Sequence, residues 1–312
     1  MSEKDSSYQE SLKSLDTEEN IDLWFYRPIG YAWACLARKI GITPNAITIA
    51  SIFLGIGAGV AFYFNNIWIN IIGIVLLIWA NSFDSADGQL ARMTKQYSRI
   101  GRILDGLSGD IWFFTIYLSI CLRENATVPF FHDHPWVIWV IAGTAGIFHA
   151  KQAATADYYR QFHLYFLKGE EGSELESSKL LRQKFDSMPW KGNFWAKIVL
   201  FFYTNYTSSQ ERLSPAMQTL RAELAKVYNG RMPSDKFRAE FRKGSLPLMK
   251  YTNILSFNWR SIALFTSVLI GMPWLYFIFE LVVLNAILIY MISCHESLCK
   301  RLTRQLRNHT LS

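Results

Sequence analysis

Five segments of this 312-residue chain are almost free of charged side chains, although charged residues make up 18% of the sequence. They are residues 46–64, 67–80, 111–122, 136–150 and 261–294. A helix needs about 20 mostly apolar residues to cross the hydrocarbon core of a bilayer. Helices and closed barrels are the structures that satisfy their backbone hydrogen bonds there. The pattern therefore predicts an all-α integral membrane protein.

We expect six transmembrane helices, over about 44–64, 67–90, 101–122, 135–158, 259–275 and 277–298. In this arrangement nearly all Lys and Arg residues lie on one side, and the turns on the other side contain only Arg123. Basic residues favour the cytosolic side of a membrane. Both termini are therefore predicted to be cytosolic. The net charge of +7 then indicates topology and attraction to anionic lipid, not nucleic-acid binding.

The charged segments predict the rest of the organisation. Residues 22–41 mix aromatic with basic residues, which is typical of an amphipathic helix in the membrane interface. The 159–258 segment is expected to be a helical cytosolic insertion against the membrane, with 194–206 too short to cross and therefore interfacial. This insertion either caps the core or takes part in substrate selection. The predicted domains are a disordered tail (1–21), the interfacial helix and first four spans (22–158), the insertion (159–258), the last two spans (259–298) and a basic tail (299–312).

Aspartates gather where the second predicted span ends and the third begins. Asp84 and Asp87 are three residues apart, so they share one face of a helix, and Asp105 opens the neighbouring antiparallel helix. Ionised carboxylates at membrane depth are costly and mark functional sites. Three adjacent anions need bound cations or buried arginines to neutralise them. Oxygen ligands at this density favour Mg²⁺ or Mn²⁺.

The spacing of these residues resembles the signature of a known family. From Asp84 to Asp105 the chain follows the pattern Asp-x2-Asp-Gly-x2-Ala-Arg-x8-Gly-x3-Asp. Small residues and one arginine fill its other fixed positions: Gly88, Ala91, Arg92 and Gly101. The pattern is similar to that of the CDP-alcohol phosphotransferases, also called CDP-alcohol phosphatidyltransferases. The resemblance implies a six-helix membrane enzyme of phospholipid synthesis. Such an enzyme moves a substituted phosphate group, such as phosphatidyl, from a CDP-linked donor to an alcohol and releases CMP.

The resemblance also implies roles for individual residues. Asp84, Asp87 and Asp105 would bind two Mg²⁺ or Mn²⁺ ions against the donor pyrophosphate. The residues that would hold the CDP moiety are Asn45, Gly88, Ala91, Arg92, Ser98 and Gly101. The implied partners are a CDP-linked lipid donor such as CDP-diacylglycerol, a small or lipid alcohol acceptor, membrane lipids and a second copy in a homodimer. The active site would open to the cytosol.

One departure from the signature concerns the general base. The family pattern ends in Asp-x3-Asp, and its last aspartate is a metal ligand and the base, but this chain has Gly109 there and Asp110 one place later. In a regular helix the i+4 position lies about 40° from Asp105, whereas i+5 lies about 140° away. A π-bulge would restore the direction of Asp110. Three accounts stay open: Asp110 is the base through a bulge, the step needs another base or little base help, or the protein binds without catalysis.

Two rival functions follow from the same residues. A cation transporter would spread its ionisable residues along a path across the membrane, whereas here they cluster near one face. A catalytically silent relative that binds CDP-lipid or nucleotide is favoured by Gly109.

Two further ionisable residues lie in the last two spans. Arg260 is predicted to contact a phosphate or a lipid headgroup, and Glu280 to be a packing residue toward the outer side.

Overall fold

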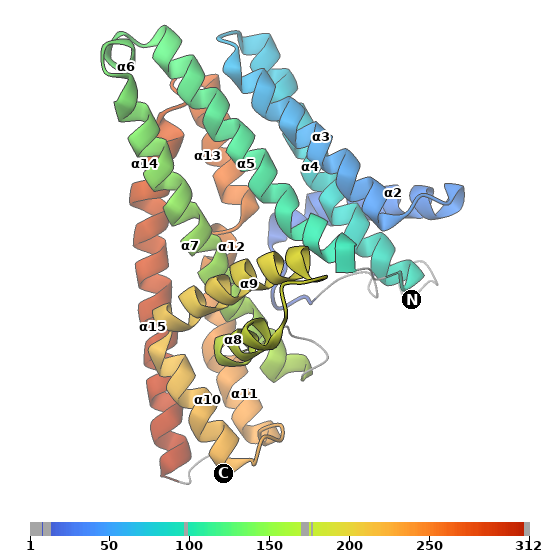
Figure 1. Cartoon of the computed structure of the whole chain (residues 1–312), viewed down its shortest axis with the longest axis vertical. Coiled ribbons are helices and arrows are strands. Elements are labelled where there is room, and N and C mark those ends of the chain that lie inside the picture. Colours follow the sequence, from blue (N-terminus) through green and yellow to red (C-terminus); the bar gives the residue numbers. More distant parts are fainter. Residues whose placement is uncertain (1–7, 9–13, 97–98, 170–174, 176, 309–312) are drawn as a thin grey trace. The chain divides into compact units, whose positions relative to one another are not determined.

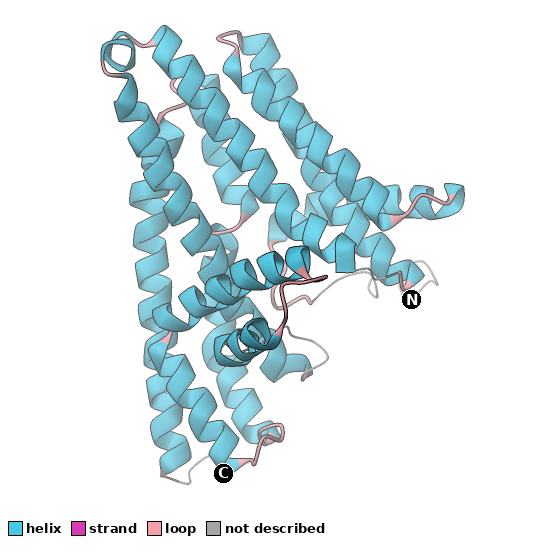
Figure 2. Ribbon diagram, viewed as in Figure 1, coloured by secondary structure: helices cyan, strands magenta, loops and turns pink. Residues whose placement is uncertain are grey.

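The computed structural model describes residues 8, 14–96, 99–169, 175 and 177–308 of the chain. Every regular element in these ranges is a helix, and Figure 2 shows helices joined by loops. The all-α class predicted from the sequence is confirmed. The chain divides into two compact units: Met1–Ile147 with Asn258–Leu281, and Phe148–Phe257 with Val282–Ser312.

The first unit contains α4 and α5, which carry the three aspartates, and the helices before and after them (Figure 1). They are the π-turn η1 (Asp22–Tyr26), α2 (Arg27–Ile40), α3 (Pro44–Tyr63), α4 (Ile67–Thr94), α5 (Arg99–Thr127), α6 (Pro129–Asp133), α13 (Phe257–Leu269), α14 (Leu275–Phe279) and the beginning of α7 (Pro135–Lys168).

The second unit contains the rest of α7 and the helices of the predicted insertion. They are α8 (Ser178–Ser187), α9 (Phe194–Leu213), α10 (Pro215–Val227), α11 (Asp235–Ser245), η3 (Leu246–Leu248) and α12 (Met249–Ile254), followed later in the chain by most of the π-turn η4 (Glu280–Leu284) and by α15 (Asn285–Arg307).

Local sequence signals set the boundary between α2 and α3. Gly41 ends α2 in the left-handed conformation, with φ of 79°, which glycine adopts without steric cost. Thr43 then caps α3, because its side-chain oxygen accepts a hydrogen bond from the backbone N–H of Ala46 at 3.4 Å. Pro44 follows in the first turn, where its missing N–H costs nothing. The predicted start of this helix is confirmed.

Glycines allow α3 to pack closely against α5. A Cβ atom at Gly55 would lie 2.0 Å from the Trp112 ring, and one at Gly59 would lie 2.7 Å from Cγ2 of Thr115. Both distances are shorter than any van der Waals contact, so these positions accept only glycine without a shift of α5. Since α3 also packs along α4, the three helices form one interlocked group (Figure 1).

Three helices among the described residues are long and apolar enough to cross a membrane. They are Pro44–Tyr63, Ile67–Thr94 and the continuous stretch Leu275–Arg307. Helices are present over all six predicted spans, but α13 has only 13 residues, fewer than the roughly 20 that a crossing requires. The six-span arrangement and the cytosolic side therefore stay predictions.

Candidate metal centre

The three predicted metal ligands lie together in the first unit. One carboxylate oxygen each from Asp84 and Asp87 on α4 and Asp105 on α5 lies within 4.8 Å of the others. Asp87 is buried, Asp84 is half-buried and Asp105 is exposed. The helical period explains the arrangement, because residues three apart share a face, and the antiparallel neighbour supplies the third carboxylate. The cluster is therefore open on the side of Asp105.

Two buried hydroxyl groups contact these carboxylates, and sequence reasoning missed both. The Ser108 hydroxyl lies 2.8 Å from Oδ1 of Asp84 and 2.8 Å from the backbone carbonyl of Asp105. On α3, the Thr48 hydroxyl donates to Oδ2 of Asp87. Each of the two residues is 2% exposed. The sequence position of Ser108 could have identified it, since Ser108 stands three residues after Asp105 and therefore lies on the same face of the helix. No such spacing identifies Thr48.

Loss of the Thr48 hydroxyl should weaken metal binding without unfolding the protein. We expect Thr48→Val to reduce Mn²⁺ affinity by roughly 10- to 100-fold, the loss typical when a metal ligand loses its hydrogen-bond partner. Thr48→Ser keeps the hydroxyl and should restore most of the affinity. Mn²⁺ binding by calorimetry on the purified chain measures the effect. Ser51→Ala is the matched control, because the Ser51 hydroxyl donates to the Thr48 carbonyl at 2.7 Å and not to a carboxylate. An affinity equal to that of the parent protein in Thr48→Val would contradict this role.

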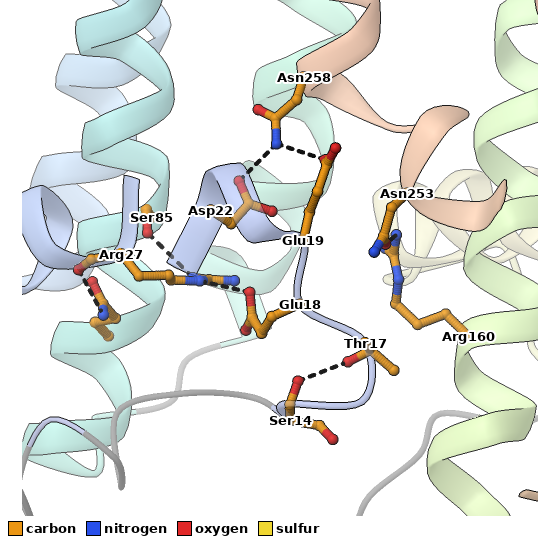
Figure 3. A network of polar contacts seen from close by, with 11 residues as sticks. Ser14, Thr17, Glu18, Glu19, Asp22, Arg27, Ser85, Arg160, Asn253 and Asn258 are labelled. Carbon is orange, nitrogen blue, oxygen red and sulfur yellow. Dashed lines mark hydrogen bonds and ion pairs between the residues drawn. The ribbon is translucent and has the colours of Figure 1, made fainter. Parts of the chain in front are cut away.

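The basic side chain of Arg27, at the start of α2, interacts with the cluster; Figure 3 shows its contacts with Glu18 and Ser85. The Arg27 guanidinium donates to Glu18 at 2.9 Å and to the Ser85 hydroxyl at 3.2 Å, and it interacts electrostatically with Asp84. The Gln89 amide donates to the Arg27 carbonyl at 3.2 Å, so the start of α2 is fixed to α4. The arginine thus offsets part of the negative charge.

The chain just before α2 makes a second set of contacts, also in the first unit. The Asn258 amide donates to Glu19 at 2.8 Å and to Asp22 at 2.9 Å (Figure 3). Residues 14–21, which the sequence assigned to a tail, therefore include defined polar contacts at Glu18 and Glu19.

The residues predicted to hold the CDP moiety, apart from Ser98, lie on the same three helices. Asn45 is half-buried in the first turn of α3, and Gly101 is half-buried at the start of α5. On α4, a Cβ atom at Gly88 would meet Nη1 of Arg92 at 3.3 Å, so the guanidinium lies over the glycine one turn earlier. Ala91 is half-buried beside it. Ser98 lies outside the described residues.

The proposed base, Asp110, is not part of the cluster. Helix α5 is a regular α-helix from residue 99 to 127, without the π-bulge that would turn Asp110 toward Asp105. Asp110 is exposed and, at five residues after Asp105, points about 140° away around the helix. A Cβ atom at Gly109 would meet nothing within 4 Å, so the position in register with Asp105 is empty of side chains and has room for one.

The donor set fits a hard divalent cation. All three groups offer oxygen, the ligand type that Mg²⁺ and Mn²⁺ prefer. Two oxygens on opposite sides of Mg²⁺, each about 2.1 Å from the ion, lie about 4.2 Å apart. Oxygens within 4.8 Å of one another need only small side-chain rotations to reach that spacing. Asp84, Asp87 and Asp105 could therefore hold such an ion.

Comparison with known protein families gives a match for this part of the chain. Residues 41–164 match the family model described as CDP-alcohol phosphatidyltransferase, a family of transferases of substituted phosphate groups. The matched range includes the carboxylates, both hydroxyls and the residues around Arg92, but not the insertion after residue 164. No curated protein matches the chain in a sequence search. The resemblance inferred from the spacing of the aspartates is confirmed.

Proposed function

We propose that this chain, of which residues 41–164 match the CDP-alcohol phosphatidyltransferase family model, transfers a phosphatidyl or similar group from a CDP-linked donor to an alcohol. CMP is the second product. The observation that carries the proposal is the convergence of Asp84, Asp87 and Asp105 within 4.8 Å, inside the matched segment. The reaction requires Mg²⁺ or Mn²⁺, held by these three carboxylates.

The protein groups divide into two sets in this proposal. Asp84, Asp87 and Asp105 bind the ions, and Thr48 and Ser108 orient two of these carboxylates through hydrogen bonds. Arg92 offers a planar pair of donors suited to phosphate oxygens. Gly88 leaves the backbone of α4 open beneath that guanidinium. Asn45, Ala91, Ser98 and Gly101 complete the contacts to the CDP moiety.

The chemistry is a displacement at phosphorus. A bond forms between the acceptor oxygen and the phosphorus of the transferred group, and the bond from that phosphorus to the CMP oxygen breaks. When bound, divalent ions neutralise charge on the pyrophosphate and stabilise the leaving oxygen. The proton of the acceptor hydroxyl passes to a base or to water.

The proposed setting is a membrane. The donor is a CDP-linked lipid such as CDP-diacylglycerol, the acceptor is a small or lipid alcohol, and the active site faces the cytosol beside the bilayer. Six membrane helices and a homodimer complete this proposal. Two of the three apolar helices long enough to cross, α3 and α4, contribute groups to the site, which supports a reaction at the membrane surface.

The test of this function is a CMP-release assay. The purified full-length chain in lipid nanodiscs is incubated with Mg²⁺, CDP-diacylglycerol and a panel of polyol, amino-alcohol and lipid-alcohol acceptors. We expect CMP release that depends on both the metal and one class of acceptor, and that stops with a chelator. Tight donor binding without CMP release for any acceptor would instead favour the silent relative.

The silent relative is the second candidate, and Gly109 is the observation that favours it. The position in register with Asp105, where the family signature has its last aspartate, has no side chain here. In this function the site binds a CDP-lipid or a nucleotide with its metal, and the protein acts as an assembly partner.

Substitutions at residues 109 and 110 test whether Asp110 is the general base. Because α5 is regular, we expect Asp110→Asn to retain most of the turnover and the donor affinity. Gly109→Asp has room for its side chain and lies only about 40° from Asp105, so we expect it to tighten Mn²⁺ binding and to raise turnover if the base limits the rate. A large fall in turnover with unchanged donor binding in Asp110→Asn would assign the base to Asp110.

A further inference from the structure

Helix α9 in the second unit has its polarity inverted. Its exposed stripe is apolar: Trp195, Val199, Phe202 and Tyr206 are 77%, 39%, 66% and 40% exposed. These residues are spaced i, i+4, i+7 and i+11, so they lie within about 60° of one another around the helix. A helix that faces water has charged and polar residues on that side. The exposed face of α9 is therefore built for an apolar environment.

The opposite face of α9 is buried and largely polar. Lys197, Leu200, Thr204 and Thr207 point into the second unit and are between 4% and 7% exposed. The Lys197 ammonium donates to the Met188 carbonyl at 2.7 Å. The Thr204 hydroxyl donates to the Leu200 carbonyl at 2.6 Å. The Thr204 bond lies within α9, but turning the helix to hide its aromatic residues would break the contact of Lys197 with Met188.

The helix is held in this orientation at both ends. At its C-terminal end the Gln210 amide donates to the Ala154 carbonyl of α7 at 2.8 Å. At its N-terminal end the Lys197 ammonium lies over the rings of Phe185 and Trp190, 4.6 and 4.8 Å from their centroids. The outward direction of Trp195 and Phe202 is thus fixed by contacts within the second unit.

Basic residues accompany the apolar stripe. Between residues 178 and 199 the sequence contains five basic residues and one acidic residue, Asp186. Four of the five are exposed on α8 or on the turn before α9: Lys179, Arg182, Lys184 and Lys191. The fifth, Lys197, is the buried one. Cationic groups beside an aromatic stripe match a surface that offers anionic groups above an apolar layer.

We propose that α9 and the preceding turn dock into the surface of an anionic lipid bilayer. Trp195, Val199, Phe202 and Tyr206 enter the boundary between headgroups and acyl chains, and the exposed lysines and Arg182 contact lipid phosphates. The helix lies in the plane of the membrane, because α9 is not among the described helices that are apolar enough to cross one. This inference does not depend on the proposed transfer reaction.

Spin-label accessibility in the full-length chain tests the docking. Nitroxides are attached at Trp195→Cys and, separately, at Phe202→Cys after the four native cysteines are replaced. The proteins are reconstituted in phosphatidylglycerol–phosphatidylcholine nanodiscs. Collision rates are measured with oxygen, which concentrates in acyl chains, and with a nickel chelate, which stays in water. We expect a ratio of oxygen to nickel collisions several times higher at both positions than at the control Lys226→Cys, an exposed position on α10 outside the proposed docking surface. The buried control Leu200→Cys should respond weakly to both reagents.

Contact of the apolar stripe with water or with protein, instead of lipid, would give different collision rates. High nickel collision at 195 and 202 means that the stripe faces water, and it would overturn the proposal. Low collision rates with both reagents would also overturn the proposal. Dipolar broadening of the nitroxide spectrum would then show that a second copy covers the stripe. Without broadening, another part of this chain covers it. Circular dichroism confirms that each labelled protein keeps the helical content of its parent, and two independent label positions guard against a local misfold.

The charge component has its own measurement. Replacement of Lys179, Lys184 and Lys191 by Gln should lower the oxygen-to-nickel ratio at the Trp195→Cys label in the anionic nanodiscs. In nanodiscs of phosphatidylcholine alone the same replacement should have little effect. An equal change in the two lipids would refute the anionic preference.

Discussion

Asp87→Asn should abolish metal-dependent binding of a CDP-linked donor. The substitution keeps the shape of the side chain but removes the charge of the buried member of the cluster and one of its metal-binding oxygens. The loss in Mn²⁺ affinity should exceed the roughly 10- to 100-fold that follows removal of a ligand's hydrogen-bond partner. Calorimetric titration with Mn²⁺, followed by a titration with CDP-diacylglycerol in the presence of the metal, measures both effects.

The control makes the same chemical change outside the cluster. Asp133 is an exposed aspartate in α6, so Asp133→Asn should leave both affinities unchanged. Wild-type donor binding by Asp87→Asn would remove the basis for the metal centre and, with it, for the proposed transfer. Loss of donor binding in both variants would indicate a general effect of charge instead.

The buried ion pair between Arg260 and Glu280 should dominate the stability of the first unit. Both side chains are almost completely buried, and their charged groups contact each other. Tyr276 donates to Glu280 at 2.7 Å, and the Tyr117 hydroxyl also donates to this carboxylate. Removal of one partner takes away the counter-ion of a buried charge, which costs about 3–5 kcal/mol. We expect a decrease of this size in the free energy of unfolding for Glu280→Gln, measured by detergent titration in mixed micelles.

A double substitution tests whether the unpaired charge causes the loss. In Arg260→Met with Glu280→Gln no charge stays unpaired, and the two tyrosines keep an acceptor, so most of the stability should return. The more exposed pair of Arg301 and half-buried Glu240, 3.5 Å apart, is the comparison. Its disruption by Glu240→Gln should cost no more than about 1 kcal/mol. Equal losses at the two pairs would show that burial of the first pair contributes little.

The structure corrects the prediction for Arg260 and confirms Glu280 as a packing residue. The sequence predicts Arg260 at a phosphate or a lipid headgroup, whereas its side chain is buried against that of Glu280. The expectation assumed a fifth span of full length. Helix α13 has only 13 residues before the chain turns back, so Glu280 lies opposite Arg260 and binds it. Sequence spacing alone does not reveal how early a hairpin turns.

The metal ligands were predictable because they depend on helix periodicity. A separation of three residues brings Asp84 and Asp87 to one face, and a short connection supplies Asp105 from the next helix. The hydroxyls that contact them were not predictable in the same way. Thr48 comes from a third helix, 39 residues before Asp87, and only tertiary packing brings the two together. The direction of Asp110 also depended on whether α5 contained a bulge.

The insertion illustrates another limit of sequence reasoning. The apolar segment 194–206, which the sequence predicts from its length to be an interfacial helix, lies within α9. Helical periodicity, however, identifies two faces without saying which one is buried. Only the structure shows that Trp195 and Phe202 point outward while Thr204 and Thr207 point inward.

The interlock between α3 and α5 has a consequence for how damage spreads through this protein. A single methyl group at Gly55 must displace the indole ring of Trp112, which lies on the same helix, α5, as Asp105. Gly55 lies two helical turns from Thr48 and has no chemical role of its own. A substitution there should nevertheless lower the affinity for the metal ion. Substitutions of the glycines where α3 packs against α5 should therefore have the same effect as loss of a metal ligand.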